Sequence, residues 1–213
     1  MARYKNGING PFSGKVGNVV GASCRGIDYI RALPEISSKP PSDKQLVQRH
    51  KFSLITGWLG PLKKLINIGY QGLAGEQTPM NLAVSYHMKE TVIGAVADAK
   101  IDFRKAIFSR GDLLISWIRQ LLTFANAVLQ IDWDNGPESA FCNPDDEASF
   151  IFYNEKKGKF VVFERAALRT DRNVMLQMPK TFAGDRVHGW MQFADRNQVA
   201  VSTSVYLGEL VCM

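Results

Sequence analysis

The sequence lacks any long apolar run, and this absence bears on where the protein acts. No segment approaches the roughly 20 apolar residues that a helix needs to cross a bilayer. The N-terminal segment Met1–Gly7 is positively charged, but no apolar stretch of about 7–15 residues follows it, which argues against a secretory signal. We therefore expect a cytoplasmic protein without a membrane span, and a signal-independent export route stays open.

Cysteine is scarce as well. The three cysteines, Cys24, Cys142 and Cys212, are far apart, odd in number and without C-x-x-C spacing. This pattern favours neither a disulfide framework nor a zinc site. Reduced, mostly buried thiols are the simpler interpretation.

Recognisable catalytic patterns are also missing. His50, His87 and His188 are too scattered to form a ligand set, and half-buried, hydrogen-bonded imidazoles are the better interpretation. The chain has no G-x-S-x-G elbow and no Cys–His signature, although triads can assemble from distant positions. We expect no enzyme, no cofactor, no metal and no small-molecule substrate.

Two segments resemble ligand-binding motifs but favour turns. Residues 10–16 compare with a phosphate-binding loop, yet the first glycine is out of register and Val16 stands where a hydroxyl is needed. The carboxylates of 132–138 and 145–147 could suit calcium, but the glycine comes one position too early. Asp132 and its neighbour at 134 also fit the solvent face of an alternating strand.

What the sequence does have is an uneven distribution of charge. Residues 1–64 carry eleven Lys or Arg against three acids, a net of 11 − 3 = +8, whereas residues 101–213 carry thirteen against fourteen. Such an excess favours an acidic partner, either nucleic acid or an acidic protein face, and a solvated surface is the simpler alternative. Six cations of this region are candidate contacts to an acidic partner: Lys15, Arg25, Arg31, Lys44, Arg49 and Lys51.

The first third of the chain predicts a β-hairpin followed by a connector. The runs 15–22 and 27–31 are β-prone, and residues 24–26 can turn between them. An isolated hairpin is only marginally stable, so it must dock on something. The prolines and serines of 34–41 favour an extended connector.

The next segment predicts helices. Ser42 suits an N-cap before a helix that starts at Asp43, and apolar residues spaced three and four apart continue to residue 66. Gly60-Pro61 predicts a kink or two helices end to end. Thr78-Pro79 predicts the start of a second helix over 79–95.

From residue 101 the hydrophobic period changes to two. Residues 127–133 and 199–207 alternate clearly, and weaker strands are predicted at 101–108, 113–118, 149–154, 160–166, 174–178 and 186–194. Successive short strands predict an antiparallel β-sandwich of the immunoglobulin or fibronectin kind, and hence an α+β fold. The expected domains are a hairpin arm over 1–34, a linker and helical region over 35–99, and the sandwich over 100–213.

The chain also resembles a known family. The residues that carry the likeness are Gly10–Gly21 (GPFSGKVGNVVG), Tyr29–Arg31, Gln48-Arg49 with Lys51-Phe52, and Ser202–Tyr206. They are similar to those of an uncharacterised family of bacterial proteins common in Bacteroidetes. The resemblance spans nearly the whole chain and implies no activity and no site residues.

These observations favour a structural or assembly protein that binds copies of itself or another protein. A β-prone arm on a proline-rich tether can add a strand to its own sheet or to that of a neighbour, and head-to-tail exchange would build a filament or a phage-like structure. The alternative is a nucleic-acid-associated module that uses the basic first third, although no recognised nucleic-acid-binding motif is present.

Overall fold

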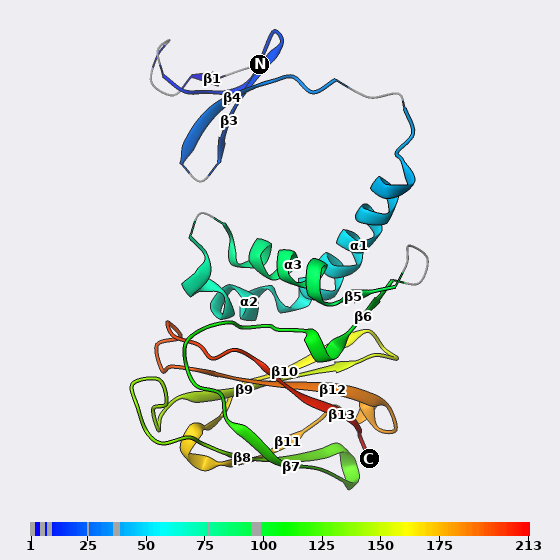
Figure 1. The fold of residues 1–213 in the computed structure, drawn as a ribbon, viewed down its shortest axis with the longest axis vertical. Helices are drawn as coiled ribbons and strands as arrows, with labels where there is room; N and C mark the ends of the chain where they lie inside the picture. Colours follow the sequence, from blue (N-terminus) through cyan, green and yellow to red (C-terminus); the bar gives the residue numbers. More distant parts are fainter. Residues whose placement is uncertain are drawn as a thin grey trace. The chain divides into compact units, whose positions relative to one another are not determined.

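The structure is a computed structural model whose contacts divide the chain into two compact units, Met1–Ser42 and Asp43–Met213. Figure 1 shows the helices and strands of each unit. The residues that the structure describes are 3–4, 7, 10–24, 26–35, 39–75, 77–94 and 99–213.

The first unit contains a four-stranded antiparallel sheet with the order β1–β2–β3–β4. Its strands are β1 (Arg3–Tyr4), β2 (Phe12–Val16), β3 (Val19–Cys24) and β4 (Ile27–Ala32). The β-prone run 15–22 is interrupted by a turn at Gly17 and Asn18, where Gly17 takes a φ of 55° that glycine adopts without steric cost. The predicted hairpin is therefore β3–β4, and β2 adds a strand before it. Arg25, in the predicted turn, lies outside the described residues.

The second unit begins with three helices: α1 (Asp43–Leu59), α2 (Lys63–Gly69) and α3 (Pro79–Glu90). The predicted interruption at Gly60-Pro61 is confirmed, because a short 3-10 helix separates α1 from α2 there. The Thr78 hydroxyl accepts a hydrogen bond from the backbone N–H of Asn81 (3.2 Å) and caps α3. α3 ends before the predicted residue 95, because the chain enters β5 (Val92–Ile93), which pairs with β6 (Lys100–Ile101).

Two antiparallel sheets follow, with the orders β10–β9–β12–β13 and β11–β8–β7. The strands are β7 (Trp117–Phe124), β8 (Val128–Asp134), β9 (Glu147–Asn154), β10 (Lys159–Leu168), β11 (Asn173–Gln177), β12 (Arg186–Ala194) and β13 (Val205–Val211). The prediction of a mixed fold with mostly antiparallel strands is therefore confirmed.

Three predicted strands differ from those observed. The segment 101–108 turns into a 3-10 helix at Phe103–Lys105, because the Asp102 carboxylate accepts the N–H of Arg104 (3.2 Å). The strand predicted at 113–118 begins only at Trp117. The strand predicted at 199–207 begins at 205, because the Asp195 carboxylate accepts the backbone N–H groups of residues 199 and 200 and holds them in a turn.

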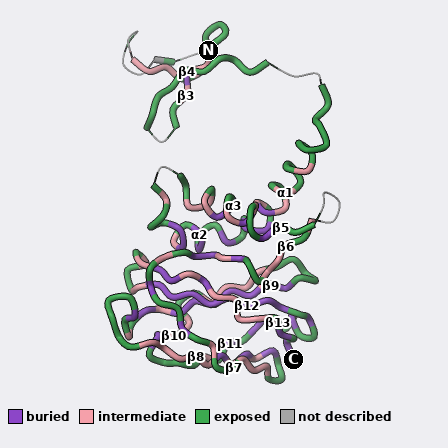
Figure 2. The backbone as a smooth tube through the Cα atoms, in the orientation of Figure 1, coloured by how far each residue is buried: buried purple, intermediate pink, exposed green. Residues whose placement is uncertain are grey.

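The four-stranded sheet β10–β9–β12–β13 is buried on both faces. Phe150 and Phe152 of β9 enter a hydrophobic cluster shared with the sheet β11–β8–β7, whereas the intervening Ile151 enters a second cluster formed with the helices. Trp190 of β12 also joins the helical cluster. Figures 1 and 2 show this order of helices, buried sheet and second sheet within the unit.

The helices pack on the four-stranded sheet. Ile55, Trp58 and Leu59 of α1 pack with Ile151 and Trp190 of the sheet, so the helices cover the face of the four-stranded sheet that the other sheet leaves open. The predicted domain boundaries at residues 35 and 100 stay a prediction. The contacts within the chain place residues 43–213 in one unit. Among the described residues, no helix is long and apolar enough to cross a membrane.

Candidate interaction surface on the N-terminal sheet

One face of the N-terminal sheet is apolar. Val16 pairs with Val19, which pairs in turn with Ala32, and Gly21 pairs with Ile30. Cross-strand partners, and residues two apart on one strand, point to the same face of a sheet. The register therefore brings Val16, Val19, Ile30 and Ala32 together on one face, which we call the apolar face.

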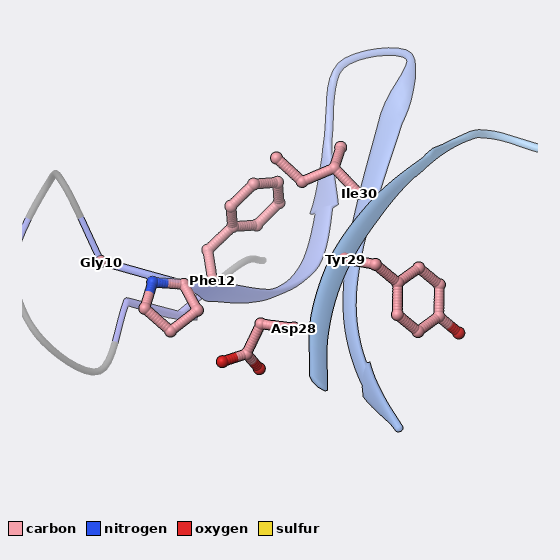
Figure 3. Close-up of a pocket in the computed structure, with 6 residues that line it drawn as sticks. Gly10, Phe12, Asp28, Tyr29 and Ile30 are labelled. Carbon is pink, nitrogen blue, oxygen red and sulfur yellow. The ribbon is translucent and has the colours of Figure 1, made fainter. Parts of the chain in front are cut away.

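Phe12 completes the apolar face by lying over Gly21. A Cβ added to Gly21 would lie 2.6 Å from Cδ2 of the Phe12 ring, so only glycine leaves room for this contact. Figure 3 shows the rings and side chains of this region, with Phe12 and Ile30 on the same side of the ribbon and Tyr29 on the other. The aromatic ring fills the gap that a glycine leaves in a sheet.

The N-terminal sheet has almost no core of its own. Among the residues of this unit that the structure describes, only Gly21 is buried. Val16 retains 42% of its accessible surface, Val19 37% and Ile30 64%. A small sheet needs a buried hydrophobic face for independent stability, so this face requires a cover.

A hollow of about 470 Å³ lies beside the apolar face. It is lined by Gly10, Pro11, Phe12, Asp28, Tyr29 and Ile30 (Figure 3). The lining combines apolar side chains with the single carboxylate of Asp28. This composition fits an apolar side chain of a protein partner better than a phosphate, which would need cations in the lining.

Two of the six predicted cations lie together on the opposite face. Lys15 and Arg31 both pair with Val20, one from each neighbouring strand, so they flank it on the same side of the sheet. Tyr29, two residues before Arg31, shares that side and is 43% exposed. We call Lys15, Val20, Tyr29 and Arg31 the basic face; Arg25 lies outside the described residues.

The other three cations, Lys44, Arg49 and Lys51, lie on α1 in the second unit. Arg49 lines a hollow of about 330 Å³ together with Gln45, Gln48 and Phe52. The structure therefore brings Lys15 and Arg31 together and places the remaining described candidates on a different element. Their role as contacts to an acidic partner stays a prediction.

The predicted turns and carboxylates have structural partners. Phe12–Val16 is a strand and not a loop before a helix, so the segment 10–16 does not have the geometry of a phosphate-binding loop. Arg119 binds Asp134, and Gln130 Nε2 donates to the Asp132 carboxylate (3.0 Å). These carboxylates face solvent on β8, as the alternating pattern predicts.

One carboxylate lies in a buried ion pair. Asp146 is buried, and its Oδ2 accepts from Nε of the equally buried Arg169 (2.9 Å). Nη1 of Arg169 also donates to the Ser116 hydroxyl, and its guanidinium lies 3.8 Å from the centre of the Phe193 ring. Burial raises the pKa of Asp146, and the charge of Arg169 opposes that rise. The arrangement joins the segments that carry Asp146 and Ser116 to the core through Arg169.

Two histidines belong to the aromatic cluster between the helices and the sheet. Nδ1 of His188 is hydrogen-bonded to the Tyr206 hydroxyl (2.8 Å). The imidazole ring stacks on the Phe103 ring with 4.2 Å between ring centres. Burial lowers the pKa of His188, which favours its neutral form. The half-buried state expected for the histidines is wrong for two of them: His87 is fully buried, with its Nδ1 hydrogen-bonded to the Ala83 carbonyl, and His50 is exposed on α1.

The apolar face is the feature that sequence reasoning missed. Its members look unrelated in the sequence, because Val16 and Val19 are separated by a turn and Ile30 joins them only through the register. The Gly17-Asn18 pair between β-prone residues was the available signal for that turn.

Comparison with known proteins agrees with the resemblance found in the sequence. No curated protein matches the chain. A family model described as a family of unknown function, DUF6266, matches residues 11–208, which include β2, the three helices and nearly all of the two sheets. Because the match covers most of its length, the chain belongs to this family of unknown function.

Proposed function

We propose that the protein is a structural or assembly protein whose N-terminal sheet docks onto another protein surface, foremost a second copy of the chain. The observation that carries this proposal is the exposed apolar face of a sheet with almost no core of its own. Such a face is stable only when covered, and protein surfaces supply apolar cover.

The size of the effect indicates what kind of contact is needed. Fully burying a Val or Ile side chain contributes about 1.5–3 kcal/mol, so covering the exposed parts of Val16, Val19 and Ile30 contributes roughly 3 kcal/mol. Association costs at least that much in lost translational and rotational freedom. Side-chain burial must therefore be joined by backbone pairing, as in the addition of a strand to a sheet.

The interpretation of the second unit fits the same function. We regard its two sheets as a β-sandwich of the immunoglobulin or fibronectin kind, because both sheets are antiparallel and point alternate residues into one shared cluster. Strands at the edges of such sheets can accept an added strand. If exchange is head-to-tail and does not close, the product is a filament or a phage-like tube.

The experiment compares one substitution on each face of β3. Val19→Asp places a charge on the apolar face, whereas Cys24→Asp places the same charge on the opposite face, where Cys24 is exposed. We expect light scattering after gel filtration to show the same oligomer for the wild type and Cys24→Asp, and a smaller species for Val19→Asp. A monomeric wild type, or a Val19→Asp variant that keeps the mass of the wild-type oligomer, would contradict the proposal.

The second candidate is nucleic-acid binding through the basic face, which places Lys15 and Arg31 beside the exposed ring of Tyr29. Cations contact phosphates and aromatic rings stack on bases. Binding of single-stranded DNA should then weaken steeply with salt, and Lys15→Glu with Arg31→Glu should abolish it. Affinity that does not change with salt, or with these substitutions, would rule this candidate out.

A further inference from the structure

Among the described residues of the first unit, β4 forms an open edge of the sheet. It is the last strand in the order β1–β2–β3–β4, and all six of its residues are exposed. The strand contains neither proline nor glycine, so its sequence does not interrupt regular backbone pairing along this edge. An edge of this kind presents unpaired backbone groups and is a template for pairing with another chain.

The hydrogen bonds to β3 show which backbone groups face outward. The N–H of Leu33, directly after β4, donates to the carbonyl of Asn18 (2.7 Å), so Leu33 points its backbone groups toward β3. Along a strand in an antiparallel sheet, successive residues point their N–H and C=O groups to opposite neighbours. Asp28, Ile30 and Ala32 therefore point their N–H and C=O groups away from β3, toward the open edge.

From this geometry we infer that β4 pairs with β4 of a second copy, antiparallel and centred on Ile30, so that two four-stranded sheets join into one. The inference rests on the proposed self-association and names its partner and register. A two-fold axis places Ile30 opposite Ile30 of the other copy, and Asp28 opposite Ala32. All outward-facing residues of both strands are then paired.

A register centred on Tyr29 leaves the edge incomplete. Asp28 would then pair with Ile30, and the outward groups of Ala32 would fall opposite Gly26, which precedes β4. Because unpaired backbone groups in an interface cost free energy, the register centred on Ile30 is favoured. The two-fold contact closes on itself and produces a dimer and not a filament.

The side chains are complementary in the register centred on Ile30. On the apolar face, the two Ile30 side chains, each 64% exposed in the single chain, cover each other. On the basic face, Tyr29 lies opposite Arg31 of the second copy, twice, which suits a cation over an aromatic ring. The two-fold axis keeps both apolar faces on the same side, so dimerisation doubles the area of the apolar face.

Disulfide trapping tests both the partner and the register. In a Cys24→Ser background, Ile30→Cys places two thiols opposite each other, and opposed residues of a hydrogen-bonded pair have Cα atoms about 5.5 Å apart, which a disulfide can span. We expect mild oxidation to convert most of this variant to a covalent dimer on a non-reducing gel. The matched control Ala32→Cys, on the same face of β4, lies opposite Asp28 and should remain monomeric on that gel.

A mixed experiment and the oligomeric state complete the test. Combining Asp28→Cys protein with Ala32→Cys protein should give a cross-linked heterodimer. Cross-linking through Tyr29→Cys in place of Ile30→Cys would overturn the register and leave self-association standing. A wild-type oligomer in which no β4 cysteine cross-links would overturn the pairing of β4 alone. A monomeric wild type would overturn both the pairing and the proposed function.

Discussion

The burial of His87 predicts how stability depends on pH. His87 is fully buried on α3, its Nδ1–H donates to the Ala83 carbonyl (2.7 Å), and its Nε2 accepts the N–H of Ile107 (3.4 Å). One donor and one acceptor describe a neutral imidazole. Desolvation by burial lowers the pKa of His87 from 6.5 to about 4, and the hydrogen bond to Ala83 opposes this in part.

The magnitude follows from the shift. Between pH 6.5 and pH 4 the unfolded chain binds a proton at His87 and the folded chain does not, so the free energy of unfolding falls as the pH falls. Each pKa unit corresponds to about 1.4 kcal/mol, so acidification to pH 4 should remove about 3 kcal/mol of stability. The contribution is fully present above pH 6.5.

Urea unfolding followed by tryptophan fluorescence measures this effect. The ring centre of Trp58 lies 5.8 Å from that of His87, so the signal reports on the right region. His87→Gln keeps a donor and an acceptor but cannot titrate, and its stability should change less between pH 7 and pH 4. His50→Gln, at an exposed position on α1, is the control, and His188 retains its own contribution to the pH dependence in both variants. Equal pH slopes for the two variants would refute the reasoning.

Two further predictions concern stability at pH 7, measured by denaturant unfolding. A Cβ at Gly69 would lie 2.5 Å from the carbonyl oxygen of Phe108, so Gly69→Ala should cost about 1–3 kcal/mol, whereas Gly57→Ala, with open space around its Cβ, should stabilise α1 by about 0.5–1 kcal/mol. Equal effects of these two variants would contradict the close packing at Gly69. Arg169→Met should cost about 3–5 kcal/mol, because it leaves Asp146 buried without its cation, and adding Asp146→Asn should recover part of the loss. A double variant no more stable than the single one would show that the lost charge is not the cause.

The helices could be predicted because their signals are local. Each signal acts on the residues beside it. α3 begins at Thr78-Pro79, and the first helix is interrupted at Gly60-Pro61. The ends were less predictable. Where α3 stops depends on β5 pairing with β6, which involves residues further along the chain.

The strands of the four-stranded sheet β10–β9–β12–β13 show only weak alternation in the sequence, and the reason is physical. Residues 148–152 of β9 are all buried, because one face meets the other sheet and the other face meets the helices. Alternation between apolar and polar residues is expected only where one face meets water. β8 has one such face and alternates along its length, so its prediction over 127–133 was close to the observed Val128–Asp134.

The candidate surface could be predicted only in part. The charge surplus pointed to Lys15 and Arg31, and the register brings them to one side of Val20. The apolar face depends on which residue of β2 pairs with which residue of β3, and a one-residue change of register would exchange the two faces. Composition and spacing do not determine that pairing.

The cysteines offer a practical consequence of this fold. Cys24 is exposed on β3, whereas Cys142 and Cys212 are buried, so a maleimide fluorophore added to the native protein should react with one thiol per chain. The dye would then lie on the other face of the sheet from Val19 and leave the apolar face free. Energy transfer between donor-labelled and acceptor-labelled chains could therefore follow assembly in real time without any engineered residue.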